Sequence, residues 1–328
     1  MSCSKTILLF LCLAVILGCK SRPGQSGMGA DETKTRAKKD LAGELTIGGA
    51  FALYPLAKKW TDDFMKMYPN VKIGITTGGT GQGIIDLIDK KVELAMISRP
   101  LSAEEHEAGV WTIPVAKDGV AAIINQKNPY IGRILRQGLS PDEFQIVFTS
   151  EKPVLWRDLL DTAGTEKAIV YSRADESGAA EMLAGFIFKE QSDLKGIKVT
   201  GDEEMIRSIQ KEPLAIGFCN FSFAFDIPTG ERKENIQVIP FDLDFDNKID
   251  RKEIPFENLE VAHRSIWLGF YPESLCRDLS IGCLGKPTDP VILQFIYFIL
   301  TEGQESVKES GLCQLNNVYI RSALESLQ

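Results

Sequence analysis

The chain is 328 residues long and acidic, with 45 Asp and Glu side chains against 37 Lys and Arg and a formal net charge of −8. This balance argues against nucleic acid or an anionic membrane surface as a partner. It does not exclude a small anionic ligand, because backbone amides and a single arginine act over a short range.

The first residues are typical of a secretory signal. Lys5 precedes an apolar run at positions 7–17, and Gly18 and Cys19 follow. The run is too short to span a bilayer. A small residue before a cysteine at the end of such a run resembles the lipobox of bacterial lipoproteins, in which the cysteine is acylated. We therefore expect residues 1–18 to be a signal peptide and Cys19 to carry a lipid anchor; the alternative is an uncleaved core helix.

The segment after Cys19 is mostly Lys, Arg, Gly, Ser and Thr. Because such a composition buries too little apolar surface to order itself, we expect residues 19–42 to be the anchor and a flexible tether. Without the signal, 310 of the 328 residues remain, enough for two domains with a core each. The most apolar later stretch, 292–300, has the length of a buried helix and not of a membrane span.

Short β-rich runs alternate with amphipathic helical stretches from residue 44 onward, which predicts an α/β fold with a mainly parallel sheet. The expected strands are 44–47, 71–76, 92–97, 121–125, 168–171 and 214–219. The expected helices are 53–67, 83–91 and 179–189, and a helical C-terminal region opens at 291–300.

Three times an expected strand runs into a Gly- or Ser-bearing turn and then a helix, at residues 48–52, 77–83 and 173–178. The first turn of a helix has unpaired N–H groups and a partial positive charge, so each turn can accept an anion. In α/β sheets such turns gather at the carboxyl ends of strands, where ligands bind. The alternative for each turn is that glycine only relieves steric crowding. The middle turn lacks the Lys-Ser or Lys-Thr of a P-loop.

Five segments in order look like the phosphate-binding proteins of ABC-type phosphate importers. They are GGAFALYPLAKKWTDDFMKMYPNVKIGITTGGTGQGIIDLIDKKVELAMISRPLSAEE at 48–105, VAKDGVAAIINQKNP at 115–129, YSRADESGAAEMLAGF at 171–186, LAIGF at 214–218 and GKPTDPVILQFIYFILTEGQ at 285–304. The resemblance implies a two-lobed periplasmic binding protein type II fold with two crossovers between the lobes. The first lobe would hold residues 43–118 and 262–328, and the second 119–261.

The resemblance also implies a set of ligand contacts. Thr80 falls where the family has a Ser, Ser98 follows the strand at 92–97, and Arg173 and Ser177 match the family's Arg and Ser. An arginine suits an oxyanion because its planar fork donates two charge-assisted hydrogen bonds. The full set of expected contacts is Ala50, Phe51, Ala52, Thr80, Gly81, Ser98, Arg99, Arg173, Ser177, Gly178 and Ala179.

The chain departs from the family's pattern at three places. Ala50, Phe51 and Ala52 stand where the family offers Ser or Thr hydroxyls, and Ala179 replaces a Thr, so only backbone N–H groups remain. Each missing hydrogen bond should weaken binding by about 1 kcal/mol. Arg99 stands where many members have an Asp that accepts the proton of hydrogen phosphate, which puts discrimination against sulfate in doubt. Arg99 either adds a cation to the site or forms a structural salt bridge at the lobe interface.

Residues 242–253 have the spacing of an EF-hand-type calcium loop. Carboxylates occupy loop positions 1, 3, 5, 9 and 12, an apolar Ile249 takes position 8, and Asn247 replaces the usual Gly at position 6. We expect a structural Ca²⁺, with a solvated acidic loop as the alternative, and no catalytic cofactor. The expected ligands are Asp242, Asp244, Asp246, the carbonyl of Lys248, Asp250 and Glu253.

These features together predict a monomeric, membrane-anchored lipoprotein of the periplasm or cell surface, which captures inorganic phosphate and delivers it to an importer permease. The alternatives are a binder of another oxyanion, such as sulfate or molybdate, and a surface sensor of the same fold. An enzyme is disfavoured, because His106 and His263 lie in no G-x-S-x-G or H-E-x-x-H motif. The pairing of Cys219, Cys276, Cys283 and Cys313 is left open between disulfides and buried thiols.

Overall fold

The computed structural model describes residues 41–160, 162–175, 177–250 and 257–327. The expected signal peptide, Cys19, nearly all of the expected tether and Glu253 lie outside the described residues.

The first lobe is built on three parallel strands, with β1 between β2 and β3. Helix α2 packs along this sheet because Leu56, Trp60 and Phe64 recur on one face and are buried. The indole N–H of Trp60 donates to the Gly303 carbonyl at 2.8 Å, which joins α2 to the C-terminal helices. The elements are β1 (Ala42–Gly49), η1 (Phe51–Leu53), α2 (Tyr54–Met67), β2 (Asn70–Ile75), α3 (Gly79–Ile88), β3 (Leu94–Ile97), α4 (Ala103–Glu107), α12 (Pro290–Leu300), α13 (Gln304–Glu309) and α14 (Asn317–Ser326).

The second lobe has its own core, centred on Phe144, Phe148, Phe218 and Phe241. Strand β5 pairs in parallel with β6 on one side and with β7 on the other. The elements are α5 (Ile131–Gln137), α6 (Pro141–Thr149), α7 (Trp156–Leu159), β5 (Ile169–Arg173), α8 (Gly178–Phe186), η2 (Gln191–Asp193), β6 (Ile197–Val199), α9 (Gly201–Lys211), β7 (Ala215–Asn220), α10 (Phe221–Ala224), β8 (Ile236–Val238), α11 (Leu259–Trp267) and η3 (Glu273–Leu275).

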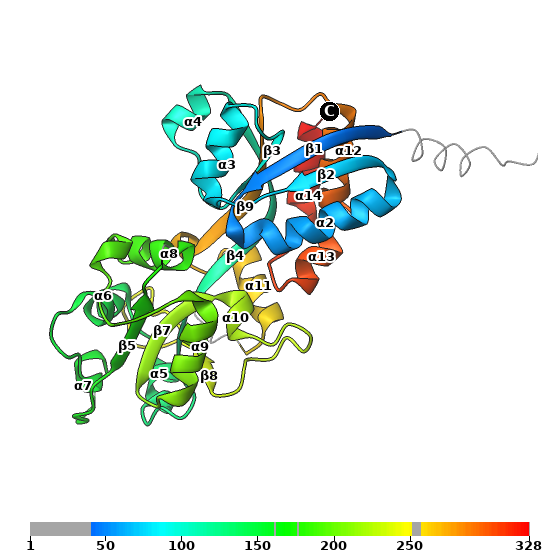
Figure 1. Ribbon diagram of the computed structural model, residues 1–328. Helices are drawn as coiled ribbons and strands as arrows, with labels where there is room; N and C mark the ends of the chain where they lie inside the picture. Colours follow the sequence, from blue (N-terminus) through cyan, green and yellow to red (C-terminus); the bar gives the residue numbers. More distant parts are fainter. Residues whose placement is uncertain (1–40, 161, 176, 251–256, 328) are drawn as a thin grey trace, which may run out of the picture.

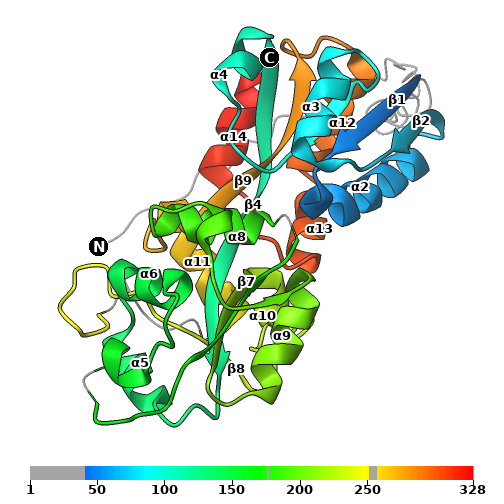
Figure 2. The ribbon, with the colours of Figure 1, turned by 60° about the vertical axis from the view of Figure 1, so that its left-hand side comes forward.

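Two antiparallel strands run between the lobes, β4 (Val110–Asn125) and β9 (Cys276–Leu284) (Figures 1 and 2). The first part of β4, from Val110 to Gly119, pairs with β9, and its second part pairs with β7 and β8. The sheet order is therefore β2-β1-β3-β9-β4-β7-β5-β6, with β8 also on β4. A single hydrogen-bonded sheet thus continues from one lobe into the other.

The structure corrects two expectations about this architecture. The sheet is mixed and not mainly parallel, because both crossing strands lie antiparallel to their neighbours. The return to the first lobe comes at Cys276 and not at residue 262, since Leu259, Ala262 and Leu275 pack in the second core. The two-lobed α/β fold with two crossovers is confirmed.

The apolar stretch near the C-terminus forms helix α12, and its Phe295, Ile296 and Ile299 are buried as predicted. Asp289 caps this helix by accepting the N–H groups of Val291 and Ile292. No helix in the described ranges combines the length and the apolarity that a membrane span needs.

All four cysteines of the described part of the chain are free thiols. Burial raises the pKa of Cys276, Cys283 and Cys313 to about 12 each. The structure therefore agrees with the buried-thiol alternative and not with disulfides.

Candidate functional site in the inter-lobe cleft

A cleft of about 680 Å³ separates the two lobes. The first lobe contributes Ser98 and Arg99 from the turn after β3, and the second contributes Gly178 and Glu181 from α8. Lys117 of β4 and, from the β9 region, Cys276, Arg277 and Asp278 form part of its lining. The cleft therefore brings together a predicted contact from each lobe, and its lining carries charges of both signs.

The turns of the first lobe lie against one another at the carboxyl ends of β1 and β3. The backbone N–H of Ser98 donates to the Thr80 hydroxyl at 3.1 Å, and the two hydroxyl oxygens are also 3.1 Å apart. Helix α3 approaches β1 so closely that a Cβ at Gly83 would lie 2.5 Å from the Gly49 Cα. Thr80 and Ser98 are thus held together by hydrogen bonds.

The turn after β1 does not line the cleft in the way that the sequence predicted. The N–H of Ala50 donates to the Met96 carbonyl at 2.9 Å, so this amide is already hydrogen-bonded within the protein. Phe51 and Ala52 are exposed, and neither they nor Gly81 line the 680 Å³ cleft. Because the neighbouring strand β3 already accepts this N–H, the structure argues against the expected ligand contact through the Ala50 amide.

Ser177 begins helix α8 as its N-cap residue. Its hydroxyl accepts the N–H of Ala180 at 3.4 Å, and its own N–H donates to the Gln191 side chain at 3.1 Å. Ala179 is buried in the second core, and Gly178 faces the cleft. The first turn of α8 therefore directs its positive end at the space between the lobes.

Arg173 ends strand β5 and is held by two aspartates. Its Nε and Nη2 donate to the carboxylate of Asp175 at 2.9 and 2.6 Å, and Nη1 lies 3.2 Å from Asp202 Oδ1. The Nη1 contact is an ion pair without hydrogen-bond geometry, so this buried nitrogen has no hydrogen-bond partner among the described residues. The Arg173 guanidinium lowers the pKa of Asp175 to about 2, while burial raises the pKa of Asp202.

Arg277 is a residue that the sequence did not single out. Its Nη2 donates to Asp118 Oδ2 at 2.9 Å, across the pair formed by β9 and β4. A Cβ at Gly178 would overlap Arg277 Nη1 and lie 3.0 Å from its Cζ, so the guanidinium sits directly against the start of α8. No motif marks Arg277, because its two neighbours come from strand pairing and from the opposite lobe.

Arg99 forms a bidentate salt bridge with Glu105, with both N···O distances at 2.8 Å. Glu105 also accepts the N–H of Ser102 at 2.8 Å and so caps α4. The hydrogen bonds that Arg99 donates to Glu105 raise the pKa of Arg99, and the charge of Glu181 on the other lobe adds to this. Arg99 therefore forms a structural salt bridge, but within the first lobe and not across the interface. Its side chain is 40% exposed and lines the cleft.

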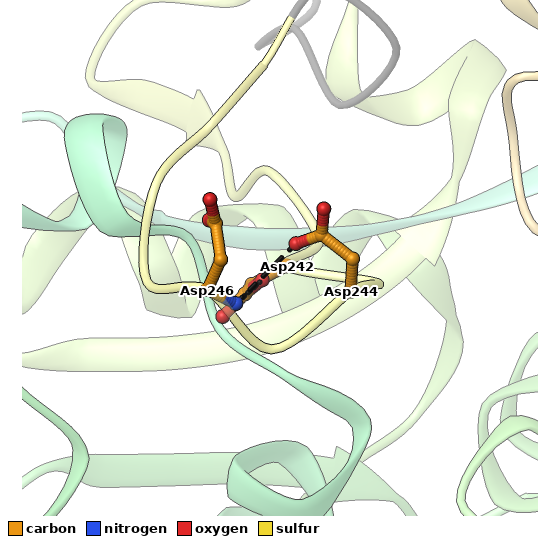
Figure 3. Close-up of side chains that lie close together, drawn as sticks. All are labelled: Asp242, Asp244 and Asp246. Atoms are coloured by element: carbon orange, nitrogen blue, oxygen red, sulfur yellow. Dashed lines mark hydrogen bonds between the residues drawn. The ribbon is translucent and has the colours of Figure 1, made fainter.

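The acidic loop brings together three of its expected ligands (Figure 3). One carboxylate oxygen each from Asp242, Asp244 and Asp246 lies within 4.8 Å of the others, and Asp242 is buried. The N–H groups of Asp246 and Asn247 donate to Asp242. Asn247 has φ +59°, the left-handed conformation that loop position 6 requires. Lys248 and Asp250 lie on the same loop and are exposed.

The two histidines lie in different environments, which yields a pH prediction. His106 is exposed beside the cleft, whereas burial lowers the pKa of His263 from 6.5 to about 4. Its Nε2 has no hydrogen-bond partner among the described residues. Between pH 6.5 and 4 the unfolded chain therefore binds a proton at His263 that the folded chain does not. The free energy of unfolding consequently decreases as the pH is lowered through this range.

We expect the free energy of unfolding to fall by about 3 kcal/mol between pH 7 and 4 on account of His263. Urea unfolding at the two pH values measures this loss. His263→Gln should remove most of the loss, while His106→Gln, the matched exposed control, should leave it in place. An equal loss in wild type and His263→Gln would contradict the assignment.

Two α/β lobes, two crossing strands between them, and a cleft lined by the start of α8 and the buried Arg277 form the architecture of solute-binding proteins. Residues 33–302 match the family described as the PBP superfamily domain. The chain therefore belongs to the PBP, or periplasmic binding protein, superfamily. Of the expected contacts, Ser98, Arg99 and Gly178 line the cleft, and the ligand-binding role of the whole set stays a prediction.

Relatives and solved structures agree with this family. The chain is 22% identical over 303 residues to "Phosphate-binding protein PstS" of Staphylococcus haemolyticus, covering 90% of this chain and 89% of the relative. A Staphylococcus aureus protein of the same name is 20% identical, covering 88% and 84%. The fold resembles an ABC-type phosphate transport receptor from Vibrio cholerae (TM-score 0.66, 20% identity, covering 83% and 100%). It also resembles PstS from Borrelia burgdorferi (TM-score 0.61, 20% identity, covering 84% and 99%).

Proposed function

We propose that this protein captures inorganic phosphate in the inter-lobe cleft and delivers it to the permease of an ABC importer. The observation that carries the proposal is the cationic end of β5. Arg173 Nη1 is ion-paired with Asp202 at 3.2 Å and has no hydrogen-bond partner among the described residues, although Arg173 does not itself line the 680 Å³ cleft. It lies on the strand that leads into α8, whose first turn supplies further donors. The relatives named as phosphate-binding proteins are similar in sequence to this chain over most of its length.

The first lobe offers the second half of such a site. Thr80 and Ser98 present hydroxyls at the carboxyl end of the first sheet, and Ser98 lines the cleft. Closure of the lobes around the anion would place these hydroxyls opposite Gly178 and Arg173. An oxyanion bound between the lobes would then be desolvated by both, which strengthens each charge-assisted hydrogen bond.

Calorimetry of the purified protein with phosphate, arsenate, sulfate and molybdate tests the proposal. We expect phosphate and arsenate to bind, because they share charge and geometry. Since Arg99 replaces the acceptor that many family members have, we expect sulfate to compete more strongly than in those members. Binding of sulfate or molybdate alone would favour the alternative of another oxyanion, and no binding of any of the four would overturn the proposal.

We also propose that the protein works as a monomer on the periplasmic or cell-surface side of a membrane, anchored through Cys19 after removal of residues 1–18. The apolar run before Gly18-Cys19 and the polar stretch after it support this. Cys19→Ala should move the protein from the membrane fraction to the soluble fraction. A variant that stays membrane-bound would contradict the anchor.

A structural Ca²⁺ in the acidic loop is the third proposal. The clustered carboxylates of Asp242, Asp244 and Asp246 and the left-handed Asn247 support it. Ca²⁺ at a hundredfold excess over its Kd should stabilise the fold by about 2.7 kcal/mol, which is several degrees in Tm.

Thermal unfolding in EDTA and in millimolar Ca²⁺ measures this gain. Asp244→Asn with Asp246→Asn should abolish the shift. Glu151→Gln with Glu203→Gln removes the same charge from exposed sites elsewhere and should retain the shift. Equal Tm values with and without Ca²⁺ would contradict the Ca²⁺ site and favour the alternative of a solvated acidic loop.

A further inference from the structure

Arg277 occupies the place where the two lobes join. It is the second residue of β9, and it pairs with Asp118 on β4, so the ion pair links the two crossing strands. Only 10% of the Arg277 side chain and 5% of the Asp118 side chain are exposed. Asp118 is further fixed because its Oδ1 accepts the N–H of Gly119 at 2.9 Å. The guanidinium is thus buried, oriented and part of the cleft wall.

The guanidinium of Arg277 faces the N-terminus of α8 on the second lobe. It fills the space that a side chain at Gly178 would need, and Gly178 is the first residue of this nine-residue helix. Donors from the helix start and from Arg277 therefore converge on one spot. Both contributors carry positive charge, so the spot favours an anion.

Among the described residues, only one of the three guanidinium nitrogens of Arg277, Nη2, donates a hydrogen bond. Its Nε is buried and has no hydrogen-bond partner within the described ranges, whereas Nη2 is bound to Asp118. Buried charged donors in native structures are nearly always paired, so an unpaired one beside a cleft is a candidate partner for a water, an ion or a ligand.

The charges around this spot show why a second arginine matters. Asp118, Asp175 and Asp202 outnumber Arg173 and Arg277 by three to two. Arg173 is bound to Asp175 through two nitrogens and pairs with Asp202 as well, so much of its charge is neutralised. Arg277 has a single carboxylate partner among the described residues. It therefore has the larger share of its charge available to an incoming anion.

We propose that Arg277 is a second arginine of the anion site, which binds the oxyanion together with the first turn of α8. This inference rests on the proposed function and adds to it a residue from the crossing strand. The oxyanion would share the guanidinium with Asp118, so that the ligand contacts the junction of the lobes as well as the lobes themselves. Arg277 would thereby offset part of the affinity lost with the missing hydroxyls at Ala50, Ala52 and Ala179.

Calorimetry with inorganic phosphate on wild type, Arg277→Gln and Asp118→Asn tests the inference. Loss of a charge-assisted hydrogen bond should raise the Kd of Arg277→Gln about 10- to 100-fold. Asp118→Asn should lower the Kd several-fold, because it frees the guanidinium while its amide oxygen can still accept the Gly119 N–H. A purely structural ion pair would weaken binding in both variants, so the opposite signs separate the two roles.

A second measurement follows phosphate binding on the wild-type protein and needs a variant only to assign one resonance. The Nε–H resonance of Arg277, assigned in nitrogen-15 NMR spectra by comparison with Arg277→Lys, should shift when phosphate saturates the wild type. No shift at saturation, or a Kd for folded Arg277→Gln within threefold of wild type, would overturn the inference. A wild type that binds none of the oxyanions would instead overturn the proposed function.

Discussion

Arg173→Met should reduce phosphate affinity at least about 100-fold and lower the free energy of unfolding by about 3–5 kcal/mol. The guanidinium is buried between Asp175 and Asp202, and Asp202 is itself 8% exposed. Removing the arginine leaves Asp202 as a buried carboxylate whose other polar partners are the N–H and side-chain amide of Asn220, at 3.2 and 3.1 Å. The loss of binding follows because the cation at the end of β5 is gone.

The double variant Arg173→Met with Asp202→Asn separates stability from binding. Burial already raises the pKa of Asp202, so a neutral amide suits its place once the arginine is absent. We expect the double variant to recover much of the lost stability and none of the lost affinity, as urea unfolding and calorimetry would show. Phosphate binding by Arg173→Met at wild-type affinity would exclude Arg173 from the site.

Gly83→Val should disrupt the packing of α3 on β1 in the first lobe. A Cβ at Gly83 would lie 2.5 Å from the Gly49 Cα and 3.0 Å from the Gly48 carbonyl oxygen. Backbone atoms cannot rotate away, so α3 must move from β1, and Thr80 at its start would move with it. We expect a cost of about 3 kcal/mol in unfolding free energy, at the upper end for overpacking, and weaker phosphate binding.

Gly81→Ala is the matched control, two residues earlier in α3. A Cβ there would meet nothing within 4 Å, and Gly81 is exposed. Alanine in a helix is favoured over glycine by about 1 kcal/mol, so this variant should be as stable as wild type or more so. Comparable destabilisation by both substitutions in thermal unfolding would show that the contact between α3 and β1 is not the cause.

Local sequence patterns predicted most of the strands and helices that carry the expected ligand contacts. Strands β1, β2 and β3 and helices α2, α8 and α12 fall where apolar periodicity placed them, with ends shifted by a few residues. The family resemblance singled out Thr80, Ser98, Arg173 and Ser177, and each lies near the end of a strand or the start of a helix. The structure then brings Thr80 and Ser98 into direct hydrogen bonding.

The amino-acid sequence by itself determined the class of the chain: an acidic protein with a signal-like N-terminus, alternating strands and helices, and helix starts prepared for an anion. The tertiary structure decided which donors remain available. The Ala50 amide donates to the Met96 carbonyl, and Arg99 is bound to Glu105. Arg277 lies beside Asp118, which is 159 positions away in the chain. Periodicity and capping are local and can be read along the chain. Strand pairing and competition for hydrogen-bond donors join distant residues, and they are settled only when the whole chain is folded.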